Sequence, residues 1–335
     1  MAQTTYGDIS PAVAASAAVE MLKRGQPNLV IQQFLQSKPL GKNQTDTMKF
    51  RRYERLSAAT TAITEGVTPT GSTPTKTDYS ATLSQYGDFL ELTDKIADMH
   101  TDPVLKEYSG MLGEQAALTL DTLAFNILKA GSNLIRANGA ARTDINTPLT
   151  LNLQRKAVRA LKRQYGEKIT TKISSSAKFN TESVKPAYIG LVHPDMTFVI
   201  RDMVGFKDVV DYGGGMDMYM GEIGAVEEVR YIESTVFEPW TNGGGAKAGS
   251  GTTMISTSGT LADVYPVLYL ARDCAGAVAL KGANAITPGV LNPGVMREGD
   301  PLGQRGYVSW KTYYTAVILN EAFMVRVECA IPELS

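Results

Sequence analysis

Apolar and polar residues follow a helical period in some segments of the chain and a strand-like alternation in others. Near the N-terminus, helical patterns cover 11–24 and 28–36. The first opens with Pro11 after the capping residue Ser10 and stops at Gly25, which are common signals for the start and end of a helix. Because the two patterns offer little surface for packing against each other, they predict an N-terminal arm.

The longest helical pattern begins after Pro103 and ends at Gly131. Its apolar residues recur along one stripe, at positions 104, 105, 108, 111, 112, 118, 120, 123, 127 and 128. About 28 helical residues span roughly 42 Å, which is the length of a central spine helix. A second helical pattern, 153–165, combines an apolar stripe with basic residues on its remaining surface.

Two strand-like segments, 47–56 and 79–93, flank a threonine-rich stretch. That stretch, 58–82, contains nine threonines with glycine and proline, and few large apolar side chains. Threonine and turn residues favour an extended hairpin over a helix, and such a segment buries too little surface to fold alone. We expect a long β-hairpin that projects from the body. An isolated ribbon is marginal in water, so its natural partner is another protein chain.

The rest of the chain mixes short strands, helices and glycine-rich loops, without the regular strand and helix alternation of a parallel sheet. The predicted fold class is therefore α+β. The expected strands lie at 187–192, 224–233, 264–271, 276–280 and 306–331.

The composition narrows the class of protein. With 335 residues, the chain can form one elaborate domain or two intertwined ones. Its 33 basic and 34 acidic residues give a formal net charge of -1, which argues against a binder of nucleic acid with a large basic excess. No apolar run approaches the ~20 residues that cross a bilayer, and the N-terminus lacks a secretion signal. We expect a cytoplasmic product in which Cys274 and Cys329 are buried free thiols.

Catalytic chemistry has few candidates, because the chain contains only two histidines. His193 follows a predicted strand, so with Asp195 it could act as the base of a cytoplasmic α/β hydrolase. No nucleophile stands at a recognisable spacing, and a turn histidine bonded to backbone is the simpler interpretation. The stretch 243–252 lacks the ending of a phosphate-binding loop, and no spacing of ligand residues indicates a metal. No cofactor is expected.

Charge is distributed unevenly along the chain. Residues 151–200 carry nine basic and three acidic side chains, whereas residues 201–250 carry four basic and nine acidic ones. Such blocks are either solvated faces or complementary edges between copies of the chain. The second interpretation predicts that the basic hairpin strand meets the acidic block of a neighbour. The candidates for contact between subunits are Lys49, Arg51, Arg52, Arg55, Lys76, Glu222, Glu227 and Glu228.

Two details refine these charge predictions. Glu227 and Glu228 are adjacent, so we expect their side chains on opposite faces of a strand, which is unsuitable for shared chemistry. On the second helix, Arg155, Arg159 and Lys162 are spaced four and three residues apart and share one face. This face is a candidate for contact with DNA phosphates.

Six short runs add a more specific signal, at 49–53, 83–89, 112–117, 137–143, 188–195 and 299–308. Together with the arm, the hairpin, the spine helix and the mixed α+β half, these runs resemble the N-four-like phage major capsid family and its Hong Kong 97-like fold. No single run is a catalytic signature, but six in order are specific together.

The resemblance implies a division of the chain into parts. Residues 1–45 would form an N-terminal arm and 46–93 an extended loop over a neighbouring subunit. Residues 94–169 would form a peripheral domain on the spine helix, and 170–304 an axial domain. The strands of 305–335 would return to the peripheral domain.

The resemblance also implies a structural protein without enzymatic turnover. Copies arranged as pentamers and hexamers would form an icosahedral head around double-stranded DNA, with a portal protein and, in some relatives, scaffolding or decoration proteins. The expected location is the virion, assembled in the cytoplasm of a host bacterium, with no membrane partner. Some relatives link subunits covalently through a loop lysine, for which Lys76 is the candidate here, although noncovalent contacts are the usual mode. An encapsulin-type nanocompartment shell is the alternative with the same fold.

Overall fold

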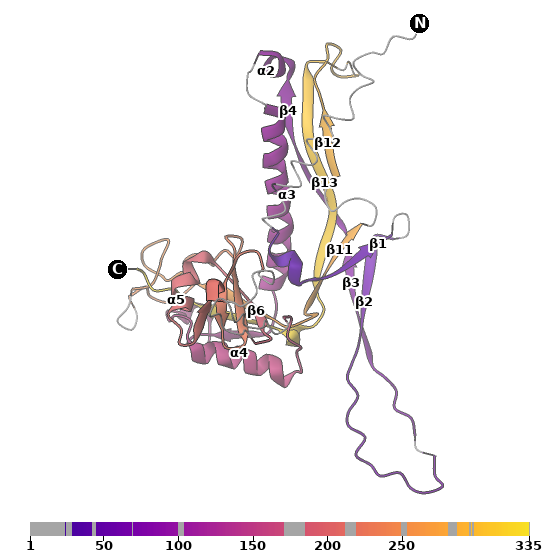
Figure 1. The fold of residues 1–335 in the computed structure, drawn as a ribbon, viewed down its shortest axis with the longest axis vertical. Coiled ribbons are helices and arrows are strands. Elements are labelled where there is room, and N and C mark those ends of the chain that lie inside the picture. The colour runs from indigo at the N-terminus through magenta and orange to yellow at the C-terminus, as the bar shows by residue number, and fades with distance from the viewer. Residues whose placement is uncertain are drawn as a thin grey trace.

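The computed structural model describes residues 24, 29–41, 45–68, 70–99, 104–170, 185–211, 219–248, 253–280, 287–294, 296 and 298–334. These residues form an elongated part, in which a long helix lies beside a long strand, and a body built on a broad sheet (Figure 1). The helix expected over 11–24 lies outside the described residues except for Arg24. The molecule is therefore an α+β protein with a projecting hairpin.

The predicted spine helix is confirmed as α3, Val104–Lys129, which follows the short helix α2, Asp94–Met99. The strand β13, Arg305–Ile318, runs beside α3 and alternates exposed and buried positions, so one of its faces packs on the helix. Leu112 of α3 and Trp310 of β13 belong to the cluster that joins them. The Trp310 indole also donates a hydrogen bond to Gln115 at 2.9 Å.

The sheet around β13 collects strands from distant parts of the chain. β4, Ser84–Thr93, β11, Ala275–Leu280, and β12, Thr287–Leu291, all pair with β13 in antiparallel fashion. β1, Gln36–Leu40, extends this sheet by parallel pairing with β11.

The helix expected over 28–36 is wrong beyond one short turn. Only η3, Ile31–Phe34, is helical, and β1 begins immediately afterwards. Pairing with β11 supplies hydrogen bonds that local helix propensity cannot match, and Pro39 is compatible with this edge position.

The projecting hairpin is confirmed, but its return strand is shorter than expected. β2, Thr47–Tyr53, pairs with β3, Lys76–Thr82, and the described residues of 54–75 form no regular structure. The expected strand over 79–93 instead divides at Leu83, after which β4 joins β13. Because β4 buries Leu92 beside the spine, it belongs to the elongated part and not to the hairpin.

The body is a seven-stranded sheet that separates two hydrophobic clusters. β6 lies near its centre and is buried on both faces, as its continuous apolar run predicts. The strand order is β5, Leu134–Arg136; β14, Met324–Cys329; β10, Tyr265–Leu270; β6, Tyr188–Val192; β9, Val229–Glu233; β8, Glu222–Val226; and β7, Phe206–Asp208. Shorter helical elements are α5, Thr197–Arg201; η4, Arg142–Asp144; η5, Pro194–Met196; η6, Val209–Asp211; and η7, Glu321–Phe323.

Several expected strands are confirmed, and two are divided. The strands expected at 187–192, 264–271 and 276–280 correspond to β6, β10 and β11. The segment 224–233 is a hairpin of β8 and β9, and the segment 306–331 contributes β13 to one sheet and β14 to the other.

The helix α4, Leu151–Arg163, lies on the body sheet and not along the spine. Its apolar side chains Val158 and Leu161 join the same cluster as Val325 and Val327 of β14. α4 and β14 therefore pack within the body, whereas the sequence-based division groups α4 with the spine helix and β14 with the peripheral strands. Burial of the α4 stripe against the broad sheet explains this placement.

Three crossings of the chain connect the elongated part to the body. The third crossing bonds to both of the others: Leu319 N donates to the carbonyl of Cys274 at 2.9 Å, and Ser132 N donates to the side chain of Glu321 at 3.0 Å. We call this region the joint, which comprises 130–133, 271–274 and 319–323.

Candidate subunit interfaces and the basic pocket

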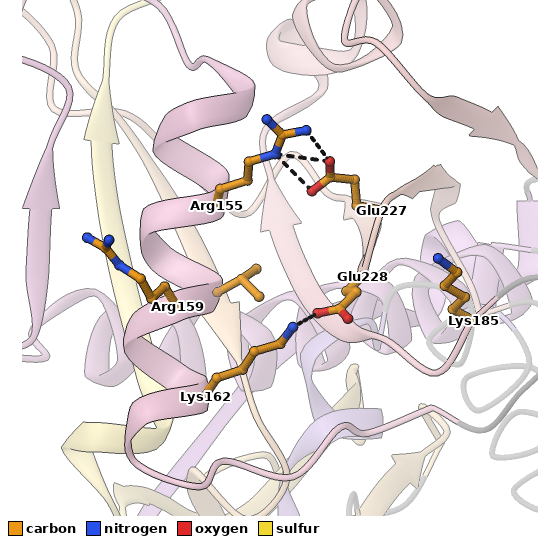
Figure 2. A pocket seen from close by; sticks show the side chains of 7 residues that line it. Arg155, Arg159, Lys162, Lys185, Glu227 and Glu228 are labelled. Atoms are coloured by element: carbon orange, nitrogen blue, oxygen red, sulfur yellow. Dashed lines mark hydrogen bonds and ion pairs between the residues drawn. The ribbon is translucent and has the colours of Figure 1, made fainter.

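A pocket of about 520 Å³ opens between α4 and the turn that joins β8 to β9 (Figure 2). The helix starts at its cap Thr150, whose side chain accepts the N–H of Leu153 at 3.3 Å. Since the apolar stripe of α4 is buried in the body, its basic side chains remain at the surface. The pocket is lined by Arg155, Val158, Arg159, Lys162, Lys185, Glu227 and Glu228.

Glu227 and Glu228 are the two turn residues between β8 and β9, so their expected placement on opposite faces of a strand is wrong. The backbone of Glu227 has φ 53°, a left-handed conformation that a tight turn requires. The turn directs both carboxylates toward α4, as Figure 2 shows. Arg155 Nε donates to Glu227 at 3.0 Å, and Lys162 forms an ion pair with Glu228.

These contacts change the proton affinities of both carboxylates. The hydrogen bond from Arg155 lowers the pKa of Glu227 and raises the pKa of the guanidinium. Burial acts to raise the pKa of Glu228, but Lys162 and Lys168, the latter at 3.3 Å, together lower it. Both carboxylates are therefore charged near neutral pH, so the pocket carries fixed negative charge beside its basic side chains.

Arg159 occupies a different position on α4. In Figure 2 its side chain points away from the two glutamates, and it forms no ion pair with any described residue. Lys185 lies across the pocket from the helix, beyond Glu228 (Figure 2). The lining thus holds four cations and two carboxylates, and Arg159 and Lys185 are its two cations that form no ion pair with a described residue. The predicted contact of Arg155, Arg159 and Lys162 with DNA stays a prediction.

Glu222 does not provide the surface carboxylate that its position in the acidic block suggests. Its side chain is 0% exposed, and Arg230, 2% exposed, donates to it at 2.6 Å from Nε. Glu222 also accepts the N–H of Tyr219 at 3.1 Å. The pair lies inside the β8–β9 hairpin. The expected contact of Glu222 with a neighbouring subunit is therefore wrong, because its side chain is buried within its own chain.

The basic residues at the hairpin are largely engaged within the chain. Arg51 pairs with Asp78 of β3 through two hydrogen bonds, at 2.8 and 3.1 Å, which lower the pKa of Asp78. Arg52 donates to the carbonyl of Leu319 at 3.4 Å. Lys49 and Lys76 are exposed. Their predicted contacts with a neighbour stay predictions, but Arg51 already has an acidic partner of its own.

Arg55 makes a further contact at the base of the loop. Its guanidinium lies 4.3 Å from the ring centre of Tyr165, just beyond the end of α4. Cation–π contacts of this kind hold exposed cations near an aromatic face. The root of the loop is therefore attached to the body.

The described residues of 54–75, which we call the tip segment, are all exposed. Apolar side chains are exposed along it, including Leu56, Ile63 at 75% and Val67 at 60%. A string of uncovered apolar side chains on an extended segment is typical of a surface that another chain covers.

A second apolar surface lies on the spine helix, and sequence patterning assigned it to the core. Met111 and Leu118 belong to the apolar stripe of α3, yet they are 54% and 50% exposed. They line a groove of about 680 Å³ together with Val30, Glu114, Gln115, Pro194, Gly221 and residues 233–236. Met111 and Leu118 are seven residues apart and lie on a different helix face from Leu112. This spacing is the signal in the sequence that indicates a second apolar face on the helix.

The two residues of the enzymatic alternative lie close together, with His193 Nδ1 3.2 Å from Asp195 Oδ2. His193 caps η5, and its Nδ1 accepts the N–H of Asp195 at 3.2 Å, which confirms a turn histidine bonded to backbone. Cys274 and Cys329 are buried free thiols, as predicted. Within the described ranges, no His, Cys, Asp and Glu side chains gather as a metal site, and no helix is long and apolar enough to span a bilayer.

Comparisons with known proteins place these features in context. A model of the family described as phage capsid protein matches residues 76–327, well over half of the chain. The major capsid protein of Pseudomonas phage KPP21 is 24% identical over 264 residues. That alignment covers 73% of this chain and 66% of the relative, so it spans just under two thirds of the relative's length.

Solved structures share the fold at low sequence identity. The capsid of Ralstonia phage GP4 superposes with a TM-score of 0.67 at 12% identity, covering 90% of this chain and 88% of that one. The head of Helicobacter pylori bacteriophage KHP40 has a TM-score of 0.58 at 11% identity, covering 92% and 91%. At these identities, the likeness establishes the fold.

Proposed function

The chain belongs to the phage capsid protein family and has the Hong Kong 97-like fold of tailed-phage major capsid proteins, and on this premise we propose that its copies assemble into an icosahedral head shell around double-stranded DNA. Phage relatives favour this function over an encapsulin-type compartment. The capping position of His193 gives no support to a hydrolase. The shell subunit acts by assembly and needs neither catalytic turnover nor a cofactor.

The observation that carries this proposal is the tip segment. It extends away from the body (Figure 1), and its apolar side chains are uncovered within the described chain. A second copy can cover them, and the groove beside Met111 and Leu118 offers an apolar surface of its own. Contact between two different surfaces of identical chains is heterologous, and it closes into rings when the rotation permits. Such rings are the pentamers and hexamers of a shell.

The division into parts follows the contacts of the described residues. The extended loop consists of β2, β3 and the tip segment. The peripheral part contains α2, α3 and the sheet around β13, and the axial part contains the seven-stranded sheet with α4. This proposed division moves the expected boundaries at 94, 170 and 305, and it moves β1 from the predicted arm 1–45 into the peripheral part.

The proposal places the subunit in the virion, after assembly in the cytoplasm of a host bacterium. A closed head that receives DNA requires a portal at one vertex, so a portal protein is the expected partner. Scaffolding or decoration proteins are further partners of the same kind.

The direct test is the mass of the purified particles. Expression of the full chain, followed by sedimentation and electron microscopy, should give closed shells in the megadalton range. A small oligomer as the largest species would contradict the proposal. Shells that enclose a cargo protein and never DNA would favour the compartment.

The basic pocket gives a prediction for DNA contact. Arg159→Gln should lower the slope of log affinity against log salt for duplex DNA by about 0.9, because one phosphate contact is lost. Glu227→Gln with Glu228→Gln should raise the affinity, since Arg155 and Lys162 lose their internal partners. Fluorescence anisotropy of a labelled duplex across a salt series measures both effects.

The control for this prediction is Lys76→Gln, which removes an exposed cation from the loop and should leave the slope unchanged. An unchanged slope in Arg159→Gln, or an equal change in Lys76→Gln, would exclude α4 as the DNA-facing surface.

A further inference from the structure

Asp121 is a buried carboxylate in the middle of α3, beneath the segment 29–35 that precedes β1. Its Oδ2 accepts the backbone N–H groups of Val30 at 2.6 Å and Ile31 at 3.2 Å. Its Oδ1 is also buried and has no hydrogen-bond partner among the described residues. Oδ2 therefore attaches the segment to the spine helix by two hydrogen bonds, whereas Oδ1 accepts none from a described residue.

No cation compensates this carboxylate within the described part of the chain. Arg24, the described cation that precedes the segment, instead pairs with Glu107 at 3.2 Å and Glu114 at 2.9 Å. Burial raises the pKa of Asp121 to about 6, against the lowering effect of hydrogen bonds from the backbones of Val30 and Ile31 and from Gln32. An ionised carboxylate is costly to bury without a counter-ion, and the cost disappears when the group is protonated.

The other titratable groups around Asp121 stay uncharged over the relevant range. Gln32, on the segment, donates to the Tyr314 hydroxyl of β13 at 2.7 Å. Burial raises the pKa of Tyr314 to about 12, and it does the same for Cys274, which shares the hydrophobic cluster beneath the segment. Neither group changes charge between pH 4 and 8, so Asp121 is the group that responds there.

We propose that Asp121 is a proton-coupled anchor, which takes up a proton at Oδ1 when the segment 29–35 docks on α3 and releases it when the segment lifts. Protonation at the unused oxygen leaves Oδ2 free to accept both N–H groups, so the hydrogen bonds survive the change. Docking is intramolecular, and this inference therefore goes beyond the proposed function and holds for a single subunit.

The sign of the pH dependence follows from linkage. In the lifted state Asp121 is solvated and has an ordinary pKa, whereas in the docked state its pKa is raised. Docking is therefore strongest in acid and weakens as the pH rises through about 6. Between pH 7.5 and pH 5.0, the equilibrium should shift toward the docked state about tenfold. Because Val30 also lines the groove beside Met111, docking fixes one wall of that groove.

Hydrogen exchange on the soluble full chain tests the anchor. After correction for intrinsic exchange, the protection of the amides in 29–35 should rise about tenfold from pH 7.5 to pH 5.0. Asp121→Asn keeps an acceptor but does not titrate, so its protection should be nearly constant. Constant or falling protection of the wild type in acid would overturn the proposal, and so would an equal rise in Asp121→Asn.

Two further measurements separate the anchor from general acid effects. Asp78→Asn removes an exposed carboxylate at the hairpin, and it should keep the tenfold rise. If Asp121→Asn does not fold, carbon NMR of the wild-type aspartate carboxyls replaces it. A titration midpoint near 6 for Asp121 supports the anchor, and a midpoint at 4 or below overturns it.

Discussion

Replacement of residues 55–74 by an Asn-Gly turn is expected to give a folded, soluble subunit that forms no closed particles. The β2–β3 ladder continues to the bond from Glu54 N to the carbonyl of Thr75 at 2.9 Å, so a two-residue turn just beyond it keeps the hairpin closed. The described residues among those removed have exposed side chains and contribute nothing to the described hydrophobic clusters. Their proposed function is contact with a second copy of the chain.

Sedimentation measures whether closed particles form, and circular dichroism measures whether the subunit is folded. The variant should sediment as a small species with an unfolding curve close to that of the wild type. A milder variant, Leu56→Ser with Ile63→Ser and Val67→Ser, should reduce particle yield strongly, whereas Thr60→Ser with Thr61→Ser should not. Normal shells from the shortened chain would refute the function assigned to the tip segment.

Glu222→Ala is expected to lower the free energy of unfolding by about 3–5 kcal/mol, the largest loss that we predict for a single substitution. The variant leaves Arg230 buried without its carboxylate, and the protein cannot hydrate that charge without opening the β8–β9 hairpin. The N–H of Tyr219 loses its acceptor as well. Removal of one member of a buried ion pair costs far more than the intact pair contributes.

Urea unfolding of the soluble subunit, followed by fluorescence, gives the measurement. Glu227→Ala is the matched control, because it makes the same chemical change on the same hairpin but breaks a pair in contact with water. Its loss should be several times smaller, since exposed ion pairs contribute little to stability. Equal losses in the two variants would mean that the burial of Glu222 does not determine its contribution.

The parts of the fold that the sequence predicts are those with strong local patterns. The spine helix α3 follows from its long apolar stripe and from Pro103 and Gly131 at its ends. Strands β6 and β10 follow from apolar runs of strand length, because both are buried on two faces. In each case the local signal and the tertiary burial agree.

The interfaces depend on register and turns, which local patterns do not encode. The pairing of Arg51 with Asp78 requires the register of β2 on β3, and a long intervening loop does not specify it. Glu227 adopts a left-handed turn without the Gly or Asn that usually signals one. For Met111, an apolar stripe shows that a face is covered, but it does not distinguish the chain's own core from a second copy.

The joint has a mechanical consequence for the proposed shell of pentamers and hexamers. Three chain crossings that share hydrogen bonds resist bending more than a single linker does, because 319–323 bonds to both of the other crossings and rotation there must break those bonds. The spine and the body therefore move as one rigid body. Pentamers and hexamers differ in curvature, so other segments, above all the tip segment, must change conformation between the two. The angle between the spine and the body should then be nearly equal in every copy.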